Sequence, residues 1–121
     1  MNQIEELVQR FVKVWNETDP SRRGEEVRNL WHIDGRHVMG ANDSRGHEAL
    51  EQHVTASNRR SVLEKNCLFR PATEIQALPG VVKFRWDMAH RDTNQVVSAG
   101  VGFLMLDDNH RITCDYLFAE S

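Results

Sequence analysis

The sequence contains few cysteines and no long apolar run. Among 121 residues there are two cysteines, Cys67 and Cys114, which lie far apart, so neither a disulfide framework nor a paired zinc site is indicated. No segment approaches the ~18 consecutive apolar residues that a membrane helix needs. The first ten residues are acidic and amphipathic, unlike a secretion signal. We therefore expect free thiols and a soluble, cytoplasmic protein without a membrane partner.

Charge of one sign is not concentrated anywhere in the chain. Eighteen acidic and 15 basic residues give a net charge of -3, and no basic block is present. Binding a phosphate backbone requires such a block, so we expect no nucleic-acid partner. The six histidines show none of the short spacings that are typical of metal sites. We therefore expect no metal and no cofactor.

The first half of the chain shows helical periodicity. The length suits one domain over residues 1–121. Apolar residues predict a helix over about 3–17, and Asp19-Pro20 opens a second helix that ends near Asp34-Gly35. A short strand follows, and Asn42, Asp43 and Ser44 offer caps for a third helix. In that helix His53 takes the place of an apolar residue on the inward side.

From Asn66 onward the period changes to two, which predicts four antiparallel strands. In the second strand, Phe84, Trp86 and Met88 share one face, and Arg85 and Asp87 share the other. The third strand is apolar on both faces. The last strand places Ile112, Cys114, Tyr116 and Phe118 together, opposite Asp115 and Leu117.

The order of elements predicts an α+β fold. Its sheet is curved and mainly antiparallel, with three helices on the concave side, in the order α-α-β-α-β-β-β-β. Leu104, Leu106 and Leu117 suggest that the outer face of the sheet is also covered. In so short a chain a second copy of the same sheet is the simplest cover, so we expect a homodimer.

Several segments carry a resemblance to a known superfamily: "FVKVWNETDP", "LWHIDGRHVMG", "RGHEALEQHV", "VVKFRWDM" and "AGVGFLMLDDNHRITCDYLF". With the order of elements, they resemble nuclear-transport-factor-2-like proteins, and among these the SnoaL-like group. The resemblance covers nearly the whole chain. It implies a cystatin-like cone that encloses one pocket and pairs through its outer sheet. Relatives include ketosteroid isomerases, polyketide cyclases, epoxide hydrolases and dehydratases, beside members that only bind or assemble.

A residue-by-residue match to the ketosteroid-isomerase branch indicates that this chain lacks the catalytic groups of that branch. Met39 stands at the position of the general-base carboxylate. Phe11 and Val101 stand at the positions of the two hydrogen-bond donors. None of the three can perform the role that the resemblance implies. The resemblance thus predicts a pocket that lacks the carboxylate of related isomerases and cyclases.

The predicted pocket is aromatic and largely apolar, which suits a small apolar or aromatic molecule. His37 and His53 are the candidate catalytic residues, because imidazole can act as acid or base near neutral pH. Both could equally be core histidines or ligand anchors. The candidate ligand-binding residues come from the helices and from most of the strands: Trp15, Trp31, Met39, Phe84, Trp86, Met88, Phe103, Tyr116 and Phe118.

Two classes of function remain open. The first is a noncatalytic binding protein, which the sequence slightly favours. The second is a small-molecule enzyme, either an isomerase or cyclase that uses His37 and His53, or an epoxide-hydrolase-like enzyme that uses Arg85, Asp87 and Asp115. The hydrolase requires the polar row of its strand to face the pocket, and burying two charges there costs more than burying Phe, Trp and Met.

Overall fold

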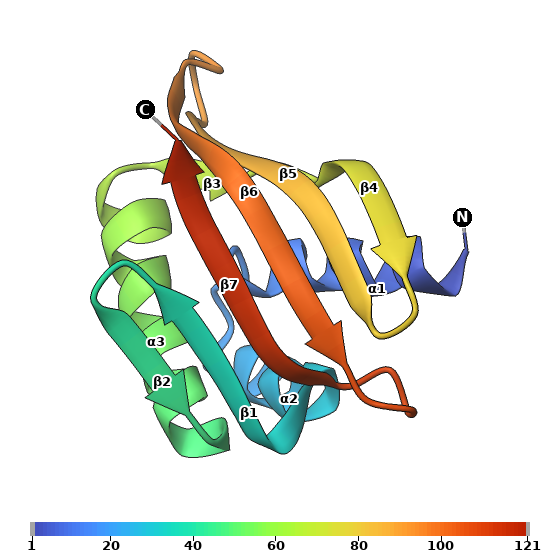
Figure 1. The fold of residues 1–121 in the computed structure, drawn as a ribbon. Coiled ribbons are helices and arrows are strands. Elements are labelled where there is room, and N and C mark those ends of the chain that lie inside the picture. Colours follow the sequence, from blue (N-terminus) through green and yellow to red (C-terminus); the bar gives the residue numbers. More distant parts are fainter. Residues whose placement is uncertain (1, 121) are drawn as a thin grey trace.

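The computed structural model describes residues 2–120, which form one curled sheet with helices on its inner side (Figure 1). The helices are α1 (Gln3–Val14), α2 (Pro20–Leu30), α3 (His47–Asn58) and the π-helical segment η1 (Arg59–Glu64). The strands are β1 (Trp31–Met39), β2 (Asn42–Arg45), β3 (Cys67–Phe69), β4 (Thr73–Leu78), β5 (Val81–His90), β6 (Val96–Leu106) and β7 (Ile112–Glu120). None of the described helices is long and apolar enough to cross a membrane.

Side-chain caps fix the starts of the first two helices. The Asn2 carboxamide accepts the Glu5 N–H at 2.8 Å, and the Asp19 carboxylate accepts the Ser21 N–H at 2.9 Å. The second cap and Pro20 at the first helical position confirm the predicted start of α2. Helix α1 ends at Val14, earlier than predicted.

The predicted start of the third helix is wrong. The capping candidates Asn42 and Asp43 belong to β2, which forms a hairpin with β1 after Gly40, a residue with φ of +58°. The Arg36 guanidinium holds the hairpin by donating to both carboxylate oxygens of Asp43, at 2.8 and 2.7 Å. Helix α3 therefore begins only at His47.

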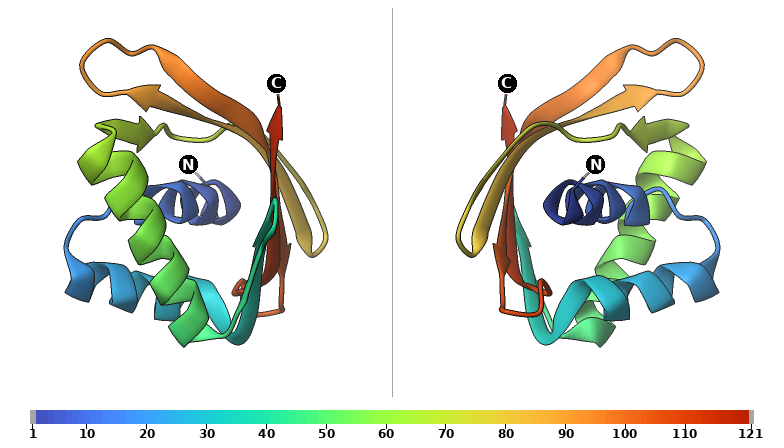
Figure 2. Two further views of the ribbon diagram at one scale, coloured as in Figure 1. Left: turned by 90° about the vertical axis from the view of Figure 1, so that its left-hand side faces the viewer. Right: turned by 90° about the vertical axis from the view of Figure 1, so that its right-hand side faces the viewer.

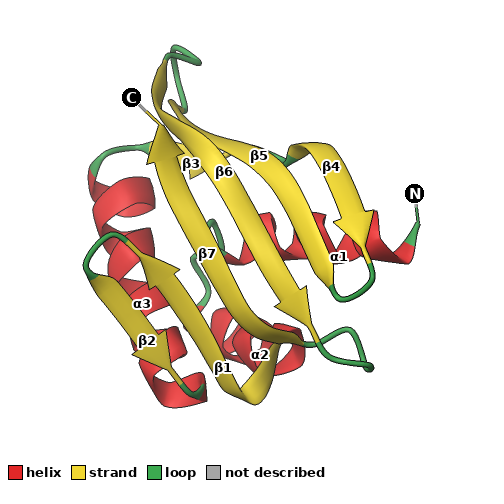
Figure 3. Ribbon diagram, viewed as in Figure 1, coloured by secondary structure: helices red, strands yellow, loops and turns green. Residues whose placement is uncertain are grey.

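The sheet has the strand order β2-β1-β7-β6-β5-β3, with β4 also paired to β5. Strands β1 and β7 are parallel, and the other pairs are antiparallel. One strand was predicted directly after Asn66, but the structure has two, β3 and β4, because Pro71 interrupts the segment. These two strands pair with opposite ends of β5. All helices lie on one side of the sheet, which confirms the α+β cone (Figures 2 and 3).

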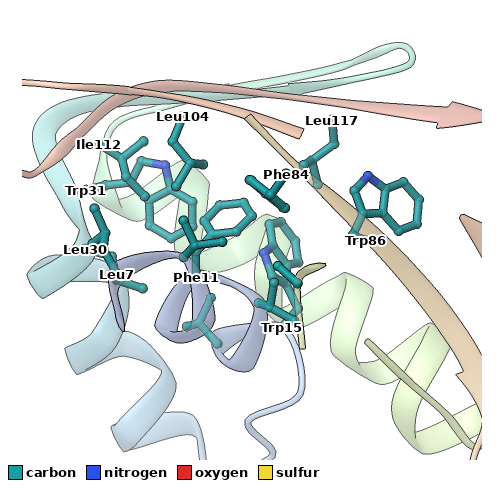
Figure 4. Packing of buried hydrophobic residues seen from close by; sticks show 14 of the residues in the cluster. Leu7, Phe11, Trp15, Leu30, Trp31, Phe84, Trp86, Leu104, Ile112 and Leu117 are labelled. Carbon is teal, nitrogen blue, oxygen red and sulfur yellow. The ribbon is translucent and has the colours of Figure 1, made fainter. Parts of the chain in front are cut away.

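A dry core fills the narrow end of the cone, between α1 and the sheet (Figure 4). The Phe11 ring lies 5.6 Å from the Trp31 ring and 5.8 Å from the Phe84 ring, centroid to centroid. Leu104 and Ile112 are fully buried beside them. Aromatic rings at these spacings pack edge to face, so this end of the interior is closed.

The predicted inward face of β6 is wrong. Gly100 and Gly102 face inward, because the Trp86 and Phe84 rings lie against them. A Cβ at Gly100 would overlap the Phe118 carbonyl oxygen, so no larger residue fits there. Val101 and Phe103 therefore lie on the outer face. Since the strand is apolar on both faces, alternation alone could not orient it.

The predicted inward face of β7 is wrong as well. Ile112 is buried as predicted, but the pairing of β6 with β7 shifts register immediately after it. Such a bulge adds a residue and reverses the alternation that follows. Asp115 and Leu117 are consequently buried, and Phe118 is 56% exposed. Cys114 and Tyr116 share the outer face with Phe118.

Candidate functional site

A cavity of about 310 Å³ lies at the wide end of the cone. It is lined by six of the predicted site residues: Trp15, His37, Met39, His53, Trp86 and Met88. Eight further residues complete the lining: Asn42, Ser57, Arg60, Ser61, Lys65, Phe69, Ser98 and Leu117. A groove of about 390 Å³ between α1 and α2 is lined by acids and bases, among which Arg10 and Glu26 pair at 3.2 Å. We therefore take the wide-end cavity as the candidate site.

Hydrogen bonds from the helices hold the aromatic wall of this cavity. The Asn58 carboxamide donates to the Trp15 carbonyl at 2.9 Å, which ties α3 to the end of α1. The Asn16 carboxamide donates to the Phe69 carbonyl at 2.7 Å and accepts the Phe69 N–H at 2.9 Å. These bonds fix Trp15 and Phe69 beside the cavity.

His37 and Asp115 form a buried pair at the base of the cavity. Because β1 and β7 run parallel with these two residues in register, their side chains lie side by side. The imidazole Nδ1 is 2.5 Å from Asp115 Oδ2, and both side chains are almost completely buried. The indole of Trp31 donates to the other oxygen, Oδ1, at 2.9 Å. A register shift in β1 between Trp31 and Arg36 lets both side chains reach one carboxylate.

Burial raises the pKa of Asp115, and the contacts with His37 and Trp31 oppose that rise. A carboxylate in this position favours a proton on the His37 Nδ1. In that tautomer the second ring nitrogen, Nε2, carries the lone pair of the neutral imidazole.

The other nitrogen of His37 is buried without a hydrogen-bond partner. Nε2 makes no hydrogen bond to the described residues, and neither does the indole nitrogen of Trp15 or of Trp86. All three residues line the cavity. Buried polar atoms are nearly always paired, so an unpaired group at a cavity wall indicates a place for a ligand atom or an ordered water.

His53 faces His37 across a short gap. Their ring centroids are 5.1 Å apart, and the Trp15 ring lies within 5.8 Å of His53 and 4.9 Å of His37. Burial, the nearby His37 and Arg60 lower the pKa of His53 to about 4. His53 is therefore uncharged at neutral pH, able to donate or accept one hydrogen bond without competing for the proton of the pair.

No family model matches the chain, and no curated protein does. Among solved structures, the chain is similar to a candidate isomerase of the SnoaL-like family from Agrobacterium tumefaciens str. C58. The two are 21% identical over 100% of both chains, with a TM-score of 0.89. It is also similar to a candidate polyketide cyclase from Sinorhizobium meliloti (12% identical, 93% of each chain, TM-score 0.70). A third, a cystatin-like protein from Nostoc punctiforme, is 13% identical over 98% of this chain and 89% of that one, with a TM-score of 0.73.

The chain has the SnoaL-like, nuclear-transport-factor-2-like fold. This confirms the resemblance inferred from the sequence at the level of the fold. Met39 does line the cavity of this cone. The carboxylate near the cavity instead comes from β7, as Asp115 behind His37.

Five of the predicted ligand-binding residues lie away from the cavity. Trp31 and Phe84 are fully buried in the dry core, and Trp31 contacts the site through its hydrogen bond to Asp115 and its packing against the Trp15 ring. Phe103, Tyr116 and Phe118 lie on the outer face of the sheet, where the Phe103 and Phe118 rings meet edge to face at 6.1 Å. The prediction that these three line the pocket is wrong, for the reasons of strand orientation given above.

The residues of the epoxide-hydrolase alternative do not converge. Arg85 pairs on the outer face with Glu74 at 3.2 Å and Glu120 at 2.6 Å. Asp87 accepts two hydrogen bonds from Arg70, at 2.6 and 2.9 Å. Asp115 is buried on the opposite side of the sheet. That alternative is therefore wrong.

Asp115 is the functional residue that sequence reasoning placed on the wrong face. Its signal was a lone carboxylate within an apolar strand, "ITCDYLF", which normally requires a partner when buried. The pair Arg59-Arg60 is typical of a solvated helix face, so sequence reasoning did not select Arg60, and no pattern singled out Ser61 or Lys65. Within residues 2–120, no group of three or more metal-binding side chains comes together.

Proposed function

We propose that this protein is a small-molecule enzyme that catalyses proton transfer, of the isomerase or cyclase class, with His37 as general acid and base. The observation that carries the proposal is the unpaired Nε2 of a buried histidine whose Nδ1 is held by a buried carboxylate. A noncatalytic binding pocket has no need of this arrangement, which costs stability.

The proposed chemistry begins at Nε2. Its lone pair removes a proton from carbon next to a carbonyl group, and the electrons of the C–H bond move into an enolate. The imidazolium that forms is neutralised by Asp115, at 2.5 Å. In an isomerase the same Nε2–H returns the proton to another carbon. In a cyclase the enolate attacks a second carbonyl carbon of the substrate, and the Nε2–H then protonates the alkoxide that forms. Neither route needs an oxidant or a reductant.

In this scheme Trp31 is a positioning residue and His53 is a second catalytic residue. The Trp31 indole keeps Asp115 oriented toward His37. The uncharged His53, across the cavity wall from His37, can donate a hydrogen bond to the substrate oxygen as negative charge develops there. The names of the Agrobacterium and Sinorhizobium proteins, a candidate isomerase and a candidate polyketide cyclase, agree with this class of reaction.

Hydrogen–deuterium exchange tests the proposal without knowledge of the substrate. A panel of 1,3-dicarbonyl compounds and β,γ-unsaturated ketones is incubated with the protein in D2O, and NMR follows loss of the C–H signal. We expect exchange that falls at least about 100-fold in His37→Gln and in Asp115→Asn, since acid–base catalysis contributes that much. His90→Gln, outside the cavity, is the matched control. Probes that bind without faster exchange would contradict the proposal and leave a binding role.

We also propose that two copies pair through the outer sheet face. Val97, Met105 and Phe118 are 53%, 38% and 56% exposed there, next to the Phe103 ring. Exposed apolar groups gathered on a sheet favour a partner. Sedimentation should give a dimer for the wild type and a monomer for Phe118→Lys. A monomeric wild type at tens of micromolar would contradict the pairing.

A further inference from the structure

We infer that the molecule bound in the cavity is an organic anion, with an apolar or aromatic body in the cavity and one anionic group at Arg60 and Lys65. This inference rests on the proposed function, because it names the substrate class of the same site. It follows from the charge of the lining, the shape of α3 and η1, and the depth of His37.

The charge of the cavity lining differs from that of the whole chain. The chain carries a net charge of -3, yet the lining contains Arg60 and Lys65 and no aspartate or glutamate. Across the described residues, neither cationic side chain makes an ion pair or a hydrogen bond. Two unpaired cations beside a cavity without acids favour an anionic ligand.

The π-helical segment places both cations on one side. His53, Ser57 and Ser61 follow one another at intervals of four residues and line the cavity together. Beyond Asn58 the helix widens into η1, in which the hydrogen bonds run between residues five apart. Lys65, which is five residues after Arg60, therefore returns to the same side. Single π-helical turns of this kind occur frequently at functional sites.

The cations and the acid–base pair lie at different depths. Arg60 and Lys65 are exposed, whereas His37 is fully buried. Arg60 is nevertheless close enough to His53 to contribute to its lowered pKa. A ligand held at the cations would therefore place its body against Trp15 and Trp86, in the same cavity that His37 lines. The volume of about 310 Å³ limits that ligand to a small molecule.

The test uses three probes that share one aromatic body: 2-naphthoate, 2-naphthyl phosphate and the uncharged 2-naphthamide. Binding is followed by the indole N–H signals of the three tryptophans in 1H–15N NMR spectra. Trp15 and Trp86 line the cavity, whereas Trp31 lies behind Asp115, so the signals locate each probe. We expect both anions to bind more tightly than the amide; the ratio of their affinities distinguishes a carboxylate from a phosphate ligand.

The decisive variant removes both cations. In Arg60→Gln with Lys65→Gln, we expect the dissociation constants of the two anions to rise about tenfold and that of the amide to stay within twofold. Arg59→Gln is the matched control, since Arg59 lines a separate hollow beside α3. Added salt should weaken binding of the anions to the wild type alone.

Two results would overturn the inference. One is unchanged binding of the anions to the double variant; the other is an equal loss in Arg59→Gln, which would show only a general effect of surface charge. His37→Gln separates this inference from the proposed function, because it removes the base and leaves the cations. If anion binding depends on Arg60 and Lys65 but the protein does not accelerate C–H exchange, the catalytic proposal is refuted and the anion site stands. If the protein accelerates exchange but anion binding does not depend on the two cations, the anion site is refuted and the catalytic proposal stands.

Discussion

The two ends of the cone's interior are both built from strands β5, β6 and β7, but they differ in whether their buried polar atoms have hydrogen-bond partners. At the narrow end, Phe11, Phe84 and Leu104 are almost fully buried, and the indole N–H of Trp31 donates to Asp115. At the wide end, a cavity is bordered by unpaired nitrogens of Trp15, His37 and Trp86. The narrow end therefore resembles the core of any small domain, whereas the wide end has a cavity and polar atoms without protein partners.

This difference indicates that the wide end, which holds the candidate site, contributes less to the stability of the fold than the narrow end does. Leaving a buried donor or acceptor unpaired costs about 1–3 kcal/mol, and the wide end holds three such groups. The closed narrow end has to offset that cost by burying aromatic and aliphatic surface. Departures from local rules of packing and pairing are expected at functional sites.

The largest expected effect is a difference in the free energy of unfolding lost when a side chain is truncated at each end. Phe84→Ala should lower the free energy of unfolding by about 3–5 kcal/mol, because it opens a void in the closed end. Met88→Ala, on the same face of β5 but at the half-buried cavity wall, should cost about 1 kcal/mol. Urea unfolding of the two variants measures the difference. Equal losses would show that the wide end is packed as tightly as the narrow one.

A smaller effect tests the bond that joins the two ends. Trp31→Phe removes the N–H that Asp115 accepts at 2.9 Å and should cost about 2 kcal/mol. That N–H favours the ionised carboxylate, so its loss raises the pKa of Asp115 further. A carboxyl whose pKa is raised on folding loses stability as pH rises. The penalty should therefore be larger at pH 8 than at pH 4.5, and denaturation at both values measures it. A penalty independent of pH would mean that the protonation of Asp115 is the same at both pH values in both proteins.

The smallest effect concerns His53. Folding lowers its pKa from 6.5 to about 4, so the unfolded chain takes up a proton before the folded one does. Stability from this group is therefore complete above about pH 6.5 and is lost as the pH falls toward 4. The loss should reach at most about 2 kcal/mol, since the ring is partly solvated. His53→Gln should show a flatter stability curve across this range. If the free energy of unfolding varies with pH equally in the wild type and in His53→Gln, the His53 ring would be solvated rather than buried.

The fold could be predicted because its signals are local. Helical spacing in α1, the Asp19-Pro20 cap and alternation in β5 each specify an element without reference to distant residues. The β2 hairpin was missed because Asn42 and Asp43 suit a helix cap equally well, and only the Arg36 ion pair decides between them.

The site could be predicted only in part. His37, His53, Met39 and Trp86 were found because they interrupt or continue clear inward patterns. Asp115 was misplaced because a bulge after Ile112 reverses the faces of β7, and a bulge leaves no mark in the periodicity of one strand. Its pairing with His37 also depends on two strands that are far apart in the sequence.

The most direct test of the central claim is the protonation of the His37 ring, measured by two-bond 1H–15N NMR of selectively labelled histidine across the pH range in which the protein is folded. The account predicts that the neutral ring carries its proton on Nδ1, beside Asp115, and that its Nε2 is unprotonated. In Asp115→Asn the carboxamide should donate to Nδ1, so that Nε2 carries the proton of the neutral ring. An Nε2 in the wild type that stays protonated up to high pH would contradict the account, because such a ring could donate a hydrogen bond but could never act as a base.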